Sequence, residues 1–164
     1  MKKIVISAGA LAALAVSTPA LAANTAQATA TVDIVSPLTL TNTSPLNFGT
    51  IIGPFNGEVV EMSSGGSRTC PGTLTCTSAA VSAADFTVAG TVSQALKVTV
   101  DPSVTLNGSI SGTLNVDLTT DLPGAVSTDT SGNATFGVGG SLAIPLGTAD
   151  GVYSGKFNVT VQYQ

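Results

Sequence analysis

The sequence has no histidine and no tryptophan, and only 9% of its 164 residues are charged. Without histidine, the chain cannot build a Ser-His or Cys-His nucleophile pair, and it lacks an ordinary ligand of catalytic zinc. It also contains no Gly-x-Ser-x-Gly elbow, phosphate-binding loop or dinucleotide fingerprint. These absences predict a protein that is not an enzyme and that holds no cofactor and no metal ion.

Basic residues are scarce as well. Five Lys and Arg stand against nine Asp and Glu, which gives a formal net charge of −4 and does not suit a nucleic-acid partner. Two of the basic residues, Lys2 and Lys3, precede an apolar run over residues 4–16, and a small-residue pattern follows that ends at Ala22. This arrangement is typical of a secretory signal peptide, with an apolar run too short to span a bilayer. We therefore expect cleavage after Ala22 and export of residues 23–164 through the periplasm.

The chain has two cysteines, Cys70 and Cys76, with five residues between them. In an exported protein, two cysteines most often form a disulfide. A redox pair or half of a metal site are the alternatives. The spacing is not Cys-x-x-Cys, however, and no further thiol or imidazole is present to complete a metal site. We predict a structural disulfide that restrains a short loop.

Alternation of apolar and polar residues dominates the exported part of the chain. Runs with this period of two recur every 8–12 residues with turn signals between them, and no stretch shows a convincing helical period. The runs cover residues 25–34, 38–41, 46–52, 58–62, 86–92, 96–100, 104–106, 109–111, 114–118, 136–146 and 153–163. The pattern predicts an all-β protein, an immunoglobulin-like β-sandwich.

Three local signals refine this prediction. Asn107-Gly108 predicts a two-residue hairpin turn between strands at 104–106 and 109–111. Pro145 predicts that the run 136–146 is an edge strand or contains a bulge. Residues 129–133 (DTSGN) read as a turn, although the spacing of their oxygens loosely resembles a calcium loop without its further acidic ligands.

The two ends of the exported chain carry the most informative strands. The N-terminal one presents small and then larger apolar residues on one face: Ala26, Ala28, Ala30, Val32 and Ile34. The C-terminal one follows Gly151 and presents a longer apolar row: Tyr153, Phe157, Val159, Val161 and Tyr163. Chain ends usually fray unless something holds them, so we expect both strands to be structural.

These ends resemble the subunits of chaperone–usher pili. Residues 28–35 (ATATVDIV) look like the donor segment of the alpha-type fimbrial major subunits. Gly151-Val-Tyr-Ser-Gly, with Tyr163 in the penultimate position, is similar to their closing strand. The resemblance implies an incomplete immunoglobulin-like fold that lacks its seventh strand and leaves an apolar groove beside its last strand. It also implies a periplasmic chaperone that fills the groove first, and an outer-membrane usher. The N-terminal extension of the next subunit then replaces the chaperone.

Nearly all of residues 23–164 also resembles a family of bacterial secreted domains without a settled activity. The resemblance is carried by residues 35–40 (VSPLTL), 46–49 (LNFG), 84–90 (ADFTVAG) and the Gly-x-Tyr-x-Gly end. Each motif alone is weak, but their order along the chain is fairly specific. This resemblance supports the fold more than the function.

We therefore expect a signal peptide at 1–22, an N-terminal extension or first strand at 23–35, and a β-sandwich domain at 36–164. The expected function is that of a structural subunit of a bacterial surface fibre, with Ala26, Ala28, Ala30, Val32 and Ile34 as donor residues. Gly151, Tyr153, Phe157, Val159, Val161 and Tyr163 would belong to the acceptor strand. The expected partners are copies of the chain or other fibre subunits. The alternative is that residues 25–35 are the domain's own first strand, within a self-complete surface or matrix module such as an adhesin.

Overall fold

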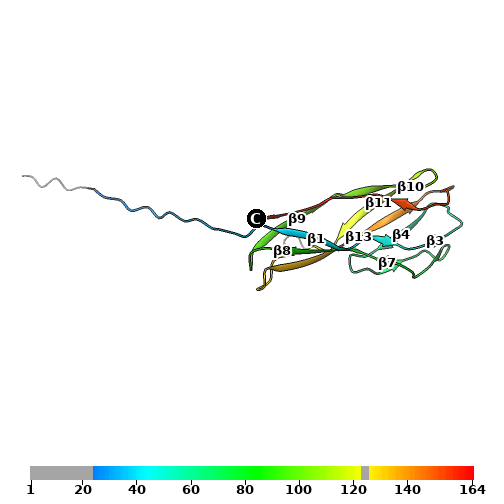
Figure 1. The fold of residues 1–164 in the computed structure, drawn as a ribbon. Helices are drawn as coiled ribbons and strands as arrows, with labels where there is room; N and C mark the ends of the chain where they lie inside the picture. The colour runs from blue at the N-terminus through cyan, green and yellow to red at the C-terminus, as the bar shows by residue number, and fades with distance from the viewer. Residues whose placement is uncertain (1–23, 123–125) are drawn as a thin grey trace, which may run out of the picture. The chain divides into compact units, whose positions relative to one another are not determined.

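The computed structural model describes residues 24–122 and 126–164, so the expected signal peptide lies outside the described residues (Figure 1). The chain divides into two units, Met1–Asp33 and Ile34–Gln164. In the first unit, residues 24–33 form no strand and all of them are exposed. The strands described below belong to the second unit.

The described residues form fifteen strands, and all their pairings are antiparallel. The larger sheet has the order β1 (Thr39–Ser44), β8 (Ala84–Ala89), β13 (Asn133–Ile144), β11 (Thr113–Thr120), β10 (Ser103–Gly108), β14 (Tyr153–Ser154). In the same sheet, β4 (Glu58–Met62) also pairs with β13, and β5 (Arg68–Thr69) pairs with β4. The smaller sheet has the order β12 (Val126–Ser127), β9 (Ala95–Val100), β15 (Val159–Tyr163). Two further pairs are β2 (Asn47–Phe48) with β7 (Val81–Ser82), and β3 (Ile51–Ile52) with β6 (Thr75–Cys76).

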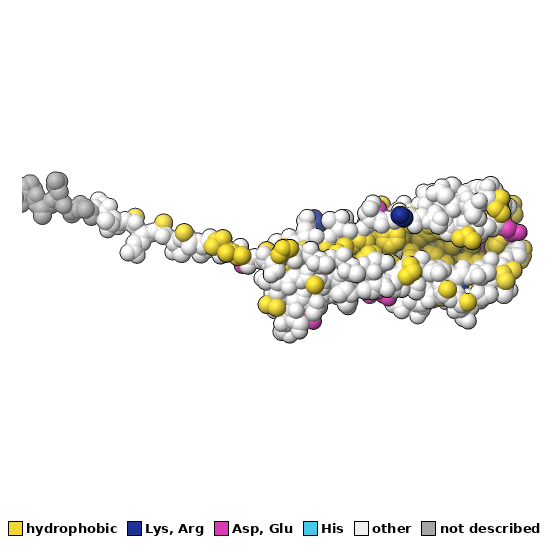
Figure 2. Space-filling view, viewed as in Figure 1, with side chains coloured by type: hydrophobic (Ala, Val, Ile, Leu, Met, Phe, Trp, Pro, Cys, Tyr) yellow, Lys and Arg dark blue, Asp and Glu magenta, His cyan; other side chains and the backbone are white. Residues whose placement is uncertain are grey.

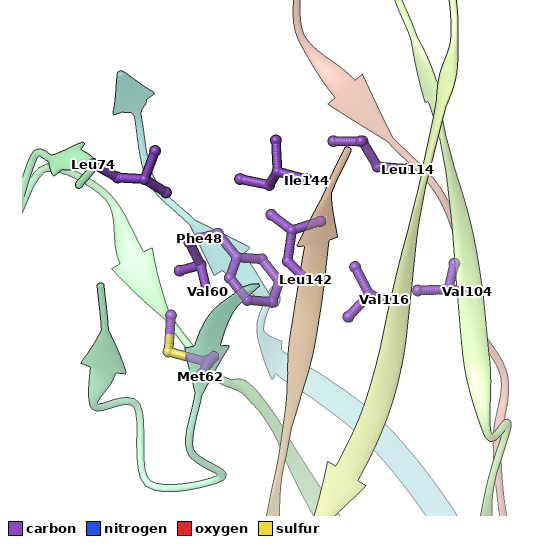
Figure 3. Packing of buried hydrophobic residues seen from close by; sticks show 9 residues of the cluster. All are labelled: Phe48, Val60, Met62, Leu74, Val104, Leu114, Val116, Leu142 and Ile144. Atoms are coloured by element: carbon purple, nitrogen blue, oxygen red, sulfur yellow. The ribbon is translucent and has the colours of Figure 1, made fainter. Parts of the chain in front are cut away.

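The core lies between facing sheets and forms two clusters. One cluster comprises Phe48, Val60, Met62, Leu74, Val104, Leu114, Val116, Leu142 and Ile144 (Figure 3). The other comprises Ala84, Phe86, Val88, Leu96, Ala134, Phe136 and Val138. Leu96 comes from the smaller sheet and its cluster neighbours from the larger one, so the two sheets pack face to face. The predicted all-β sandwich is confirmed, while its immunoglobulin-like topology stays a prediction.

β13 is the central strand, which makes the prediction from Pro145 wrong. β13 pairs with β11 on one side, and on the other with β8 in its first half and β4 in its second. The strand ends at Ile144, so Pro145 follows it and does not interrupt its ladder. The change of partner falls at Gly139, where a Cβ atom would collide with the Met62 carbonyl oxygen. Glycine is needed there because two backbones approach closely.

The predicted two-residue hairpin turn is also wrong, although the hairpin exists. Asn107 and Gly108 are the last residues of β10, and Asn107 pairs with Thr113 at the start of β11. The connection is the four residues 109–112, with Gly112 at a φ of +80°. A Cβ atom on Gly108 would collide with the Ser111 carbonyl oxygen of the connection and would lie 2.9 Å from the Tyr153 ring. Gly108 therefore allows the connection to fold back closely over the end of β10 and also leaves room for Tyr153 of β14.

Two loop predictions are confirmed. Cys70 and Cys76 form a disulfide, and their Cα atoms lie 6.4 Å apart. Residues 129–133 make the connection into β13, where Asp129 Oδ1 accepts hydrogen bonds from the backbone N–H groups of Ser131 and Asn133 at 2.8 Å each. These bonds, that from Asn133 above all, hold the pKa of Asp129 below its ordinary value. The Asp129 carboxylate thus has a structural role in the turn.

Candidate functional site

Two strands lie at open sheet edges. Among the described residues, β1 pairs only with β8, and β15 pairs only with β9. Figure 1 shows β1 and the C-terminal segment bordering the same face of the domain, with β11 and β13 visible between them. An open strand edge presents N–H and C=O groups that can pair with a further strand.

The ladder between β15 and β9 determines which backbone groups of β15 face the open side. Just outside the strand, the backbones of Asn158 and Gln164 each make a hydrogen bond of 3.1 Å to the residue opposite them on the β9 side. The direction of the backbone hydrogen bonds alternates along an antiparallel strand, so the N–H and C=O groups of the even-numbered residues of β15 point toward β9. The N–H and C=O groups of Val159, Val161 and Tyr163 therefore point to the open edge.

The side chains of these three residues are apolar and only half-buried. They pack against the cluster that contains Phe86 and Phe136, but the domain does not cover them. Figure 2 shows a stripe of hydrophobic side chains that runs along this face from the C-terminal end and becomes hollowed toward the other end, where β3 and β4 lie in Figure 1. An added strand needs free backbone groups with which to form hydrogen bonds, and half-buried apolar side chains below them against which to pack.

The opposite side of the hollow is formed by β1 and the residues before it. Leu38 and Leu40 are half-buried and pack on the same cluster as β15. Leu38 and Tyr163 meet above Gly90, where an added Cβ atom would collide with the Tyr163 hydroxyl and lie 2.7 Å from Leu38. We call this hollow the edge groove and define it by Leu38, Leu40, Phe157, Val159, Val161 and Tyr163.

An aromatic cluster supports the end of the edge groove that lies away from Tyr163. Phe86 and Phe136 are register partners on neighbouring strands, with ring centroids 5.3 Å apart and nearly parallel planes. Phe157 meets Phe86 edge-on at 6.4 Å and packs against both core clusters. Aromatic pairs of this kind add to the burial energy of each ring. The segment before β15 is therefore anchored where the two clusters meet.

Tyr163 closes one end of the edge groove. Its hydroxyl donates a hydrogen bond to Ser36 O at 2.7 Å and accepts one from Thr91 N at 2.8 Å. Ser36 N in turn donates to Thr91 Oγ1 at 2.6 Å. The end of β15, the start of the domain and the turn after β8 are thus tied together at one point.

The predicted C-terminal strand is interrupted. Tyr153 lies in β14, which pairs with β10 of the larger sheet, whereas Val159 begins β15 of the smaller sheet. Residues 155–158 connect the two and form no strand. Tyr153 packs on the first cluster, and its hydroxyl donates to Ala149 O at 2.8 Å. Gly151 lies in the turn before β14 at a φ of +152° and does not line the edge groove.

The predicted donor residues form no strand in the structure. Ala26, Ala28 and Ala30 are exposed, as are Val32 and Ile34, at 83% and 84% of their surfaces. The alternation of residues 25–34 is therefore not matched by any pairing within the described chain. Whether this segment completes its own domain or that of a neighbour stays a prediction.

The comparison with known families agrees with this division of the chain. The family described as "Domain of unknown function (DUF4402)" matches residues 38–163. The chain belongs to the DUF4402 family. No curated protein and no solved structure matches it.

The DUF4402 domain includes both sides of the edge groove, from Leu38 to Tyr163, and leaves residues 24–35 outside. The expected membership in a family of domains without a settled activity is confirmed. The likeness to chaperone–usher subunits is not tested by this match and stays a prediction.

One structural residue of the DUF4402 domain had no signal in the sequence. Arg68 donates from its guanidinium group to Phe48 O and, at 2.7 Å, to Thr77 O. It thereby ties the segment after β6 to β2. A lone basic residue in a weakly charged chain gives no pattern from which these carbonyl partners could be predicted, because they are distant in sequence.

Other features of the DUF4402 domain give weaker candidates for a site. A pocket of about 250 Å³ lies between β9 and β11, lined by residues that include Val98, Leu118 and Val126. Over residues 24–122 and 126–164, no three His, Cys, Asp or Glu side chains come close enough to hold a metal ion. In the same residues, no helix has the length and apolar character needed to cross a membrane.

Proposed function

We propose that this DUF4402 protein is a structural subunit of a bacterial surface fibre, assembled head-to-tail by β-strand donation. The edge groove receives the N-terminal segment of another copy, and each copy offers its own segment to the next. The protein has no enzymatic role in this proposal. The fibre lies at the cell surface or outside the cell.

The observation that carries the proposal is the unfilled edge of β15. The backbone groups of Val159, Val161 and Tyr163 face the open side directly above a half-covered apolar row. An extended segment that paired there would gain backbone hydrogen bonds and bury alternate side chains in the edge groove. Open hydrophobic edges promote aggregation, and proteins generally protect them. A strand from another copy would provide that protection.

The N-terminal segment has the complementary pattern. Its apolar residues alternate from Ala26 to Ile34, and Val32 and Ile34 are almost fully exposed in the chain as described. Burying each of these two side chains is worth about 1.5–3 kcal/mol. Each backbone hydrogen bond adds about 1 kcal/mol. The sum over a strand is roughly 10 kcal/mol, comparable with the roughly 5–15 kcal/mol stability of a whole domain.

Export and assembly follow from the same proposal. The expected signal peptide at 1–22 would direct the chain to the periplasm, and its removal would free the donor segment. An apolar groove needs cover during transit, which a periplasmic chaperone would supply before an outer-membrane usher exchanged it for the donor segment. The chain's partners would thus be copies of itself or other fibre subunits, with no role for nucleic acid.

The test is thermal unfolding of a chain that begins at Ser36, with and without a synthetic peptide of residues 24–35. Peptide at 100 times its dissociation constant stabilises the folded state by about 2.7 kcal/mol. For a domain of this size, that corresponds to a rise in Tm of about 10 °C. A matched peptide with Asp in place of Val32 and Ile34 should give no rise.

A shortened chain that is already stable, and indifferent to both peptides, would contradict strand donation. A self-complete secreted surface or matrix module, such as an adhesin, would then be the better function. In that case residues 24–35 would contribute nothing to stability when supplied in trans.

A further inference from the structure

The most exposed large hydrophobic side chains of residues 36–164 gather at one end of the domain. They are Ile110, Leu146 and Val152, with 76%, 77% and 74% of their surfaces exposed. All three lie in two loops, the β10–β11 connection and the segment between β13 and β14. We call these three residues the tip patch. Exposed apolar residues that gather on one surface mark an interaction site.

Backbone and side-chain hydrogen bonds hold the two loops together. Ser109 N donates to Val152 O at 2.8 Å, and Val152 N donates to Ser109 Oγ at 3.0 Å. The Tyr153 hydroxyl lies between the loops, 2.8 Å from Ala149 O and 3.3 Å from Ser111 O. The tip patch is therefore carried by one joined surface and not by two independent loops.

The opposite end of the domain contains the root of the donor segment. Ser36 is bonded there to Thr91 and Tyr163, beside the turn that carries Val92, half of whose surface is exposed. We call this surface, formed by Ser36 and residues 91–93, the base. The base and the tip patch lie at opposite ends of β13. Residues 129–132, just before that strand, form backbone hydrogen bonds with the turn at residues 90–93, whereas residues 145–152 of the tip loop follow the strand.

Only a short stretch of chain joins the donor residues to their own domain, so that domain must lie close to one end of the groove that the segment fills. Only two residue steps separate Ile34, the last donor residue, from Ser36 in the base. Two residues reach at most about 7 Å. The base of a donor copy must therefore lie against whichever end of the groove receives Ile34.

Packing decides which end that is. Each copy's own segment leaves from its base, beside Tyr163. If Ile34 entered at that end, every base in a fibre would have to contact two other bases. If Ile34 enters at the opposite end, where the chain leads from Phe157 back to Tyr153 and the tip patch, each base meets one tip, and the contact repeats without closing. The donor segment then runs antiparallel to β15.

We propose that the tip patch is a docking surface for the base of a second copy of this chain, with Ile110 and Val152 packing around Val92 of the donor. The inference rests on the proposed strand donation but concerns a separate surface. It explains why the domain exposes apolar residues outside the edge groove. The contact would make each junction stiffer and slower to dissociate than strand donation alone.

The test uses the full chain and separates the two surfaces. Ile110→Asp and Val152→Asp are made at the tip patch, and Thr119→Asp adds the same charge on the exposed face of β11 as a control. Each of these three substitutions, and the parent chain, is also combined with Val32→Asp and Ile34→Asp, so that the chain's own donor segment cannot enter a groove. Binding of the 24–35 peptide is measured with these donor-disabled chains. Polymer dissociation is measured by sedimentation with an intact donor segment.

Both tip variants should bind the peptide within about twofold of the parent, while their polymers dissociate at least about tenfold faster. The Thr119→Asp polymers should match the parent. Tip variants whose polymers dissociate like the parent would overturn the docking surface and leave strand donation intact. Tip variants that lose peptide binding would also overturn it, because the patch would then belong to the edge groove. A disabled parent that fails to bind peptide would refute strand donation and, with it, this inference.

Discussion

At Tyr163, the ring and the hydroxyl contact different parts of the domain. The ring is half-buried on the inner face of β15, as the alternation of the sequence predicts. The hydroxyl bonds to the backbones of Ser36 and Thr91, which are distant in sequence and could not be inferred from any local pattern. One residue thus connects β15 to Ser36, where the proposed donor segment joins the domain.

Replacing Tyr163 by Phe should separate these two roles. The ring stays in the edge groove, but two hydrogen bonds are lost, at a cost of about 1–2 kcal/mol in the free energy of unfolding. Ser36 is then held only by Thr91, so limited proteolysis should cut faster near residues 34–38. Tyr153→Phe is the matched control, since it removes a hydroxyl at the other end of the domain. Equal cleavage near Ser36 in both variants would contradict the tie.

Asp129 makes a prediction about acid stability. Its pKa is lowered in the folded state by backbone N–H groups, those of Asn133 and Ser131 in order of effect. A folded-state pKa below the ordinary 3.8 means that the carboxylate stabilises the fold above that pH, and that the contribution fades as the pH falls through the folded value. Asp129→Asn should therefore be less stable than the parent at pH 7 but close to it near pH 2. An equal difference in unfolding free energy at both pH values would refute this.

At the scale of the strands, local alternation predicted faces better than neighbours. The inward parity of Phe136, Val138, Leu142 and Ile144 is confirmed, because burial on one face needs only a period of two. That β13 is central was missed, since Pro145 lies one residue beyond its end. Which strand pairs with which depends on contacts between distant segments, and alternation carries no information about them.

For the edge groove, too, the sequence predicted which residues share a face but not which strands lie beside them. The apolar row Phe157, Val159, Val161 and Tyr163 was visible in the sequence, and the structure places it on one half-buried face. The crossing of residues 155–158 from one sheet to the other was not visible, because the alternation continues through it. The other side of the groove, Leu38 and Leu40, was not predicted as such. It depends on the position of β1 at an open edge of the larger sheet, which alternation along the chain does not encode.

The whole chain combines an unfilled edge with a segment that has the pattern to fill it. In the proposed assembly, filling the groove of another copy would use two different surfaces, so the contact would be heterologous and would generate an open filament. The tip patch at one end and the base at the other fit the same head-to-tail order. A chain of this kind would be only marginally stable alone and stable as a polymer.

The proposal therefore depends on the parity of the donor segment, which two matched double variants can test in the full chain. Val32→Asp with Ile34→Asp places two charges on the apolar face, and the cost of burying an unpaired charge should abolish polymers. Thr29→Asp with Thr31→Asp adds the same charges two residues apart on the other face, so polymers should persist. Electron microscopy and sedimentation of the exported protein measure the outcome. Equal polymer in both variants would mean that the segment does not enter a groove as a strand, whereas loss in the first alone requires one face buried and the other exposed.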